Sequence, residues 1–166
     1  MNHSLCREFI SHLDQDGSLK SGYAPKKIAT WLEQLGLPMD LLRFMQWDWP
    51  QTDCQIAHIS IMSSASFHTD EATACLLKHK FLNVGSAPNG DTFVIDFSTE
   101  ICVPGFITHE EWSPWSDEPQ DPRQFFQPIA RTFDSFLYRV VEGKYLPTDY
   151  YAAREFNKFL ADEHNA

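Results

Sequence analysis

The sequence predicts an α+β fold in which helices pack against one largely antiparallel sheet. Three observations predict it: an apolar stripe at helical spacing near the N-terminus, short apolar runs joined by tight turns in the middle, and a second helical stripe after residue 128. The chain has 166 residues, of which 43% are hydrophobic and 13 are Phe, so we predict one domain over residues 1–166 with an aromatic-rich core.

The N-terminal part of the chain is predicted to be helical. Apolar residues at a spacing of four predict a short helix over residues 4–13. Residues 24–35 carry the clearest helical stripe, with a proline in the first turn and Gly36 just beyond the end. A second short helix is predicted to start at Pro38.

The middle of the chain changes to short apolar runs that are typical of strands. Strands are predicted at residues 55–62, 81–84, 92–97 and 101–106. The Asn89-Gly90 pair between two of these runs is a strong hairpin signal, because both residues accept positive φ. Pro104 predicts that the last strand is an edge strand or ends early. Residues 69–80 are compatible with either a helix or an irregular connection.

The C-terminal part is predicted to return to helices. Four prolines make residues 108–128 a predicted loop. Apolar residues at helical spacing predict a helix over residues 129–141, with Gly143 just past its end. Thr148 is predicted to cap a terminal helix.

Charge is distributed unevenly along the chain. The formal net charge is −10, and no Lys or Arg occurs between Lys80 and Arg123. The acids of this segment are Asp91, Asp96, Glu100, Glu110, Glu111, Asp117, Glu118 and Asp121, interleaved with aromatic residues. Such a composition disfavours binding to nucleic acid or to an anionic membrane and suits a basic protein partner. The alternative is an acidic face that only keeps the protein in solution.

The cellular compartment is predicted from the absence of export signals and from the spacing of the cysteines. No apolar stretch is long enough for a membrane span, and the first residues include Arg7 and Glu8 without an apolar run, so no signal peptide is predicted. The four cysteines have no paired spacing. They are therefore predicted to be reduced and mostly buried, in a cytoplasmic protein.

Metal-binding motifs are weak. Residues 14–18 resemble the start of a calcium loop, but the sixth position is Leu19 and the twelfth is Pro25, where Gly and Glu are required. His68 lies near Asp70 and Glu71, a cluster that is more often a solvated turn than a metal site. No metal and no other cofactor is predicted.

Catalytic motifs are absent from the sequence. There is no GxSxG, no Walker loop and no GxGxxG, and Ser63, Ser64 and Ser66 fit a loop better than a nucleophile elbow. The adjacent acids Glu110 and Glu111 are interpreted as solvated rather than as an acid–base pair. The chain is therefore predicted not to be an enzyme; a small hydrolase with an unrecognised site is the less favoured alternative.

The hairpin region, read with its surroundings, resembles the SUKH superfamily, which includes a fungal cell-wall-synthesis regulator and many bacterial immunity proteins. The resemblance covers residues 31–141. Its motifs are Leu37-Pro38 before a short helix, the hairpin residues Gly85, Gly90, Asp91 and Asp96, a later stretch with His109, and the Phe-rich helix over residues 132–137. The chain departs from the pattern in Trp47-Asp48-Trp49-Pro50 and in a long acidic loop over residues 112–122.

The resemblance implies an α+β domain that binds proteins and has no enzymatic activity. The leading expectation is an immunity protein that neutralises a bacterial polymorphic toxin, such as a nuclease or a deaminase; the alternative is a general regulatory interaction module. An acidic inhibitor can cover a basic substrate channel. The candidate partner-binding residues are Glu110, Glu111, Trp112, Trp115, Asp117, Glu118 and Asp121. The two Trp residues either anchor the partner or pack the loop onto the sheet.

Overall fold

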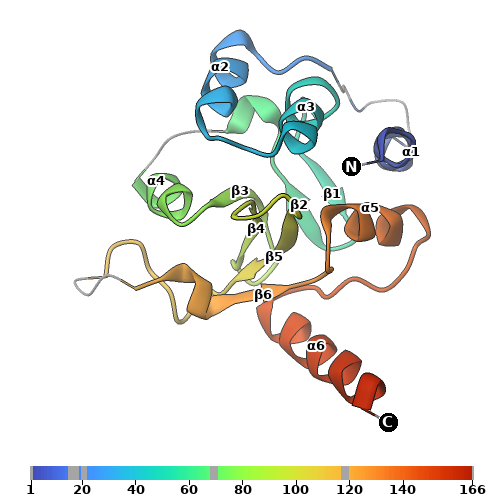
Figure 1. Ribbon diagram of the computed structural model, residues 1–166, viewed down its shortest axis with the longest axis vertical. Coiled ribbons are helices and arrows are strands. Elements are labelled where there is room, and N and C mark those ends of the chain that lie inside the picture. The colour runs from blue at the N-terminus through green and yellow to red at the C-terminus, as the bar shows by residue number, and fades with distance from the viewer. Residues whose placement is uncertain (1, 15–18, 20–21, 68–70, 117–119, 166) are drawn as a thin grey trace.

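An antiparallel sheet forms the centre of the computed structural model, which describes residues 2–14, 19, 22–67, 71–116 and 120–165, with side chains up to Lys158. The described residues form six strands, and each pairs with its neighbour in the chain, in the order β1-β2-β3-β4-β5-β6 (Figure 1). The strands are β1 (Cys54–Ile56), β2 (Ile59–Ile61), β3 (Phe81–Ser86), β4 (Thr92–Asp96), β5 (Val103–Ile107) and β6 (Phe126–Pro128). The predicted α+β class is confirmed.

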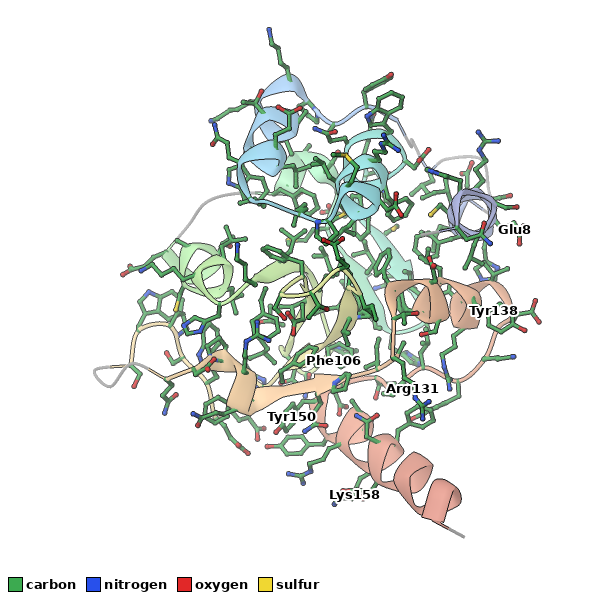
Figure 2. All side chains as sticks on the ribbon, viewed as in Figure 1. Glu8, Phe106, Arg131, Tyr138, Tyr150 and Lys158 are labelled. Carbon is green, nitrogen blue, oxygen red and sulfur yellow. The ribbon has the colours of Figure 1, made fainter. Side chains whose placement is uncertain are left out.

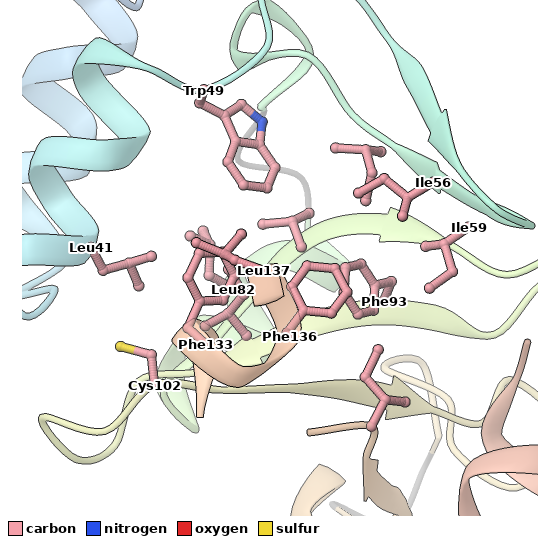
Figure 3. Close-up of a cluster of buried hydrophobic side chains, with 14 of the residues drawn as sticks. Leu41, Trp49, Ile56, Ile59, Leu82, Phe93, Cys102, Phe133, Phe136 and Leu137 are labelled. Atoms are coloured by element: carbon pink, nitrogen blue, oxygen red, sulfur yellow. The ribbon is translucent and has the colours of Figure 1, made fainter. Parts of the chain in front are cut away.

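The larger part of the core lies on one face of this sheet. Alternate residues of a strand point to opposite faces, and Phe93 and Ile95 share the face that α1 (His3–Leu13), α3 (Met39–Trp47) and α5 (Phe133–Val141) cover. Phe93 contacts Phe106 and Phe136, with ring centroids 5.4 and 5.6 Å apart. Figure 3 shows this cluster, where α5 lays Phe133 and Phe136 across the strands. Leu32 of α2 (Lys26–Gln34) is buried in the same cluster.

The opposite face carries a smaller core. Phe81, Val94 and Ile107 point to this side. They are covered by Leu76 of α4 (Glu71–Lys78) and by Trp112, which lies in the loop after β5. Of the two structures with which residues 69–80 are compatible, the helix is observed over Glu71–Lys78. Asn89-Gly90 joins β3 and β4, which are adjacent and antiparallel as predicted.

Local signals in the sequence explain how the C-terminal helices begin. Thr132 and Ser135 form a capping box, with a hydrogen bond of 3.0 Å in each direction, so α5 begins at Phe133 and not at residue 129. The cap of α6 (Tyr150–Asn165) is Asp149, whose carboxylate accepts from the Ala152 N–H at 2.8 Å. The prediction that Thr148 is this cap was wrong; its hydroxyl instead donates to Asp149.

Two strand predictions were wrong in detail. Residues 55–62 are not one strand but the tight hairpin of β1 and β2, which turns at Ala57 with φ of 53°. Pro104 does not place β5 at an edge, because β5 lies between β4 and β6. The Pro104 carbonyl accepts from the Ile129 N–H at 3.0 Å, just beyond the end of β6. The side of Pro104 that lacks an N–H donor therefore faces the end of β6, where no further strand pairing needs it.

The predicted loop over residues 108–128 also contains regular structure. It ends in the short 3-10 helix η2 (Pro122–Phe125) and in β6, which pairs with β5 from Gly105 to Ile107. Gly105 makes room for this strand, because a Cβ there would lie 2.3 Å from the Gln127 carbonyl oxygen.

The four cysteines are free thiols. Cys6 and Cys102 are buried, whereas Cys54 and Cys75 are half-buried. Burial raises the pKa of the Cys6 and Cys102 thiols to about 12 and that of the Cys54 thiol to about 11. These three thiols are therefore protonated at neutral pH.

Among the described residues, no helix has both the length and the apolar character that a membrane span requires.

Candidate protein-binding surface

The residues predicted to bind a partner lie in the loop that follows β5, here called the β5–η2 loop (residues 108–121). Trp112 fixes this loop to the sheet, because its side chain is 6% exposed and packs with Ile107 and Leu76. The Trp112 N–H also donates to the Thr108 carbonyl at 3.3 Å. The loop therefore has a defined conformation where it leaves the sheet.

A buried carboxylate holds the beginning of the same loop. Asp91 is fully buried and accepts hydrogen bonds from the His109 backbone N–H at 3.1 Å and from the His109 ring nitrogen Nδ1 at 2.8 Å. The Asn89 side chain and the Tyr150 backbone N–H donate to its other oxygen, each at 2.9 Å. Figure 2 shows Tyr150 where α6 meets the sheet. Asp91 thus connects the β3–β4 turn, the β5–η2 loop and the start of α6.

The charge of Asp91 is stabilised by these donors. Burial acts to raise the pKa of Asp91, but the hydrogen bonds from Tyr150, Asn89 and His109 outweigh burial and hold the pKa below its usual value. The first turn of α6 adds the positive end of a helix dipole at the same place. Asp91 is therefore ionised at neutral pH although it is buried.

Asp96, the second acid of the hairpin motif, has a comparable role at the other end of β4. Its two oxygens lie 2.7 and 3.3 Å from the guanidinium nitrogens of Arg123, which also donates to the His79 carbonyl at 2.6 Å. Burial acts to raise the pKa of Asp96, and the bonds from Arg123 and from the Ser98 N–H more than offset burial and lower it. Arg123 thereby ties η2 to the sheet.

The two glycines of the motif have geometric roles. A Cβ on Gly85 would lie 2.0 Å from the Ser60 carbonyl oxygen, at the irregularity in the β3–β4 pairing. Gly90 has φ of +98°, which side-chain-bearing residues rarely adopt. The four motif residues therefore shape the hairpin, and none of them is placed for contact with a partner by this geometry.

The exposed part of the β5–η2 loop is small and acidic. Trp115 is 69% exposed, and Glu110 and Glu111 are exposed beside it in the sequence. The Glu110 carboxylate accepts from the Tyr151 hydroxyl at 2.7 Å, which connects the loop to α6. Of the two Trp residues predicted as anchors, only Trp115 is at the surface.

The remaining candidate residues contribute less to this surface. Asp121 accepts from the Arg123 N–H at 2.9 Å and lies 3.2 Å from the His79 ring nitrogen, so it caps η2. Asp117 and Glu118 lie outside the described residues.

The acids and aromatics of residues 81–122 do not form one continuous face in the described part of the chain. Phe93, Phe97 and Phe106 are in the core. Glu100 lies in the turn between β4 and β5, at the opposite end of those strands from Glu110. The expected surface is therefore reduced to Trp115 and its neighbouring acids.

Two exposed aromatic side chains were missed by sequence reasoning. Trp47 and Tyr23 are 55% and 68% exposed, and their ring centroids lie 5.1 Å apart. The signal was the Trp47-Asp48-Trp49 run, in which only Trp49 belongs to the core at 1% exposure.

Catalytic or metal chemistry would need a nucleophile or further ligands beside the histidine–carboxylate pairs of the structure. In the part of the chain that the structure describes, the His109–Asp91 and His79–Asp121 pairs have no Ser or Cys within hydrogen-bonding distance of the ring. No group of three His, Cys, Asp or Glu side chains that could hold a metal occurs among the described residues. The calcium-like run over residues 15–18, and His68 with Asp70, lie outside them.

No family model, curated protein or solved structure matches this chain. The resemblance to the SUKH superfamily therefore stays a prediction.

Proposed function

We propose that this protein is a non-enzymatic protein-binding domain, and that it is an immunity protein which neutralises a bacterial toxin domain such as a nuclease or a deaminase. The observation that carries the proposal is the exposed indole of Trp115, 69% exposed on a loop whose start is fixed by Trp112 and Asp91. Trp is enriched among residues that dominate binding energy. The start of this loop, from Thr108 to Trp112, is held by contacts with the sheet, so it would lose little conformational entropy when a partner binds.

Charge supports a basic partner. The formal net charge is −10, and Glu110 and Glu111 lie close to Trp115 in the sequence. A nuclease binds phosphates and therefore carries Lys and Arg in its substrate channel. An acidic inhibitor is steered to such a channel and associates faster at low ionic strength. The free thiols suit action in a reducing compartment such as the cytoplasm.

The test is co-expression with the product of the neighbouring gene. We expect the chain to restore growth of cells that express that product and to co-purify with it. A regulatory interaction module would bind a partner without restoring growth. A hydrolase would restore growth only while its catalytic nucleophile is present. Failure both to bind and to protect would overturn the immunity proposal.

The binding surface is tested with two variants and a control. Trp115→Ala should raise the Kd at least ~30-fold, since truncation of a central Trp costs ~2 kcal/mol or more. Glu111→Lys should lower the association rate and reduce its dependence on salt. Glu142→Lys makes the same charge change at the exposed end of α5 and should lower the association rate less than Glu111→Lys does. Equal effects of the two Lys variants would place the partner elsewhere.

A further inference from the structure

A second concave surface lies between α1 and α3. It is a hollow of about 430 Å³ lined by His3, Arg7, Arg43, Trp47 and Asp48. In Figure 1, α1 and α3 lie in the upper part of the molecule, and the loop that leads to η2 lies at the lower left. The residues that line the hollow belong to α1, to α3 and to the position just after α3, and none of them belongs to the loop that carries Trp115.

The aromatic border of the hollow is not part of the core. Trp49 is 1% exposed and its indole N–H donates to the Met62 carbonyl at 2.8 Å. Trp47, two residues earlier, is 55% exposed and contacts Tyr23, which is 68% exposed. Among the described residues, the indole N–H of Trp47 has no acceptor. Two adjacent rings that remain in solvent are a recognised feature of binding surfaces.

The basic side chains of the hollow form no close ion pair with any described residue, although the charge of Arg43 acts on the nearby Asp40 and helps to lower its pKa. Arg7 and Arg43 are exposed, and neither forms an ion pair or a hydrogen bond within the described part of the chain. Other arginines are used internally: Arg123 pairs with Asp96, and Arg139 donates to the Tyr145 carbonyl at 2.7 Å. In a chain with 23 acids and 13 basic residues, the lining of this hollow is unusual, because two arginines without a close ion pair stand there against one acid, Asp48.

We propose that this hollow binds an acidic peptide segment of another protein. Guanidinium groups make paired hydrogen bonds to carboxylates, so Arg7 and Arg43 would receive the acidic side chains. Trp47 and Tyr23 would cover an adjacent apolar or aromatic side chain of the peptide. The small size of the hollow and its two arginines favour a short acidic segment over nucleic acid, because a long polyanion would extend beyond the arginines and meet the repulsion of a net charge of −10. This surface is additional to the one in the proposed function.

The proposal is tested with labelled peptides and the full chain. The probe is a fluorescein-labelled pentapeptide, Asp-Glu-Phe-Glu-Asp, and binding is measured by fluorescence anisotropy. We expect binding to this peptide, weaker binding when its Phe is replaced by Gly, and none to Lys-Lys-Phe-Lys-Lys. Arg7→Glu combined with Arg43→Glu should raise the Kd at least ~10-fold, because the acidic side chains of the peptide would then meet like charges in place of guanidinium donors.

Matched variants separate this site from general electrostatics. Lys78→Glu combined with Lys158→Glu changes the net charge equally at exposed positions elsewhere and should leave the Kd nearly unchanged. Trp47→Ala should weaken binding, whereas Tyr145→Ala, at another exposed ring, should not. Equal losses in both charge variants, or no binding by the wild type, would overturn the proposal. Displacement of the peptide by inorganic phosphate at constant ionic strength would also overturn it, in favour of a phosphate site.

Discussion

At the scale of single residues, Asp91 is the group on which most of the local structure depends. It is fully buried and accepts four hydrogen bonds from three separate segments of the chain. A buried charge is tolerated only where donors replace the lost water. Here the donors include a helix N-terminus, which explains why an acid, and not an amide or a hydroxyl, occupies the position.

We expect Asp91→Asn to lower the free energy of unfolding by about 2–3 kcal/mol at neutral pH, because an amide nitrogen would then face N–H donors. The pKa of Asp91 is lowered in the folded state. Its contribution to stability is therefore present above the unfolded pKa of about 4 and is lost as pH falls through the folded pKa. Urea unfolding measures the free energy of unfolding of the wild type and of Asp91→Asn, and the difference between the two should narrow below about pH 4. A constant difference from pH 7 to pH 3 would contradict this account.

We expect Gly85→Ala to be destabilising as well, for a steric reason. The added Cβ would lie 2.0 Å from the Ser60 carbonyl oxygen, so β2 and β3 would have to separate. Overpacking of this kind costs about 1–3 kcal/mol, which thermal unfolding measures readily. Ser86→Ala, at the next and exposed position of β3, is the control and should leave the melting temperature nearly unchanged.

At the scale of elements, the side chain of Arg123 connects η2 to the sheet. This guanidinium spans Asp96 and the His79 carbonyl and lies over the Phe81 ring, 4.8 Å from its centroid. One side chain therefore connects the end of β4, the turn after α4 and the segment before β6. Because Arg123 is partly exposed, its contribution is smaller than that of a fully buried ion pair.

We expect Arg123→Lys to lower the free energy of unfolding by roughly 1 kcal/mol, since an ammonium group cannot make the paired contacts. The variant should also loosen the segment from η2 to β6, where hydrogen exchange of backbone amides should accelerate locally. Lys158→Arg at an exposed position of α6 is the opposite exchange and should change neither quantity. Protection in η2 that is unaffected by Arg123→Lys would show that other contacts hold this element.

Elements with their own local signals could be predicted from the sequence. The stripes of α1, α2 and α5 and the Asn89-Gly90 hairpin were predicted close to their observed positions. The β1–β2 hairpin was not, because two short strands that alternate in polarity look like one strand when the turn lacks Gly or Asn-Gly. The strand β6 has no signal of its own, since it forms only because Gly105 leaves room for it beside β5.

The candidate surface was predictable only in part, for a similar reason. Trp112 and Trp115 lie in the same acidic, proline-containing stretch of sequence. An irregular loop has no periodicity that would distinguish a buried position from an exposed one. Whether a ring is covered depends on α4 and β5, which are distant in sequence. Similarly, counting charges could not show that Asp91 and Asp96 face internal donors instead of solvent.

At the scale of the whole molecule, the larger core cluster shields two of the four cysteines from solvent. Cys6 and Cys102 are buried in the larger cluster, and burial raises the pKa of each to about 12. We expect both to react with a thiol reagent at neutral pH only when the molecule opens, at a rate that increases with urea in parallel with unfolding. The rates are measured by mass spectrometry of the modified peptides. Fast modification of both thiols without denaturant would contradict this packing.

The strand order has a consequence for how the chain becomes a folded protein during synthesis. Each strand pairs with the one made just before it, so the sheet can grow in the direction of translation without waiting for a distant segment. Some contacts outside the sheet do wait for later segments: the bond from the Tyr150 N–H to Asp91 spans 59 positions, and that from the Asn2 N–H to Asp134 spans 132. Until α6 is made, the central carboxylate lacks one of its donors. Formation of the last helix therefore completes the set of donors around a buried charge that the earlier segments have already enclosed.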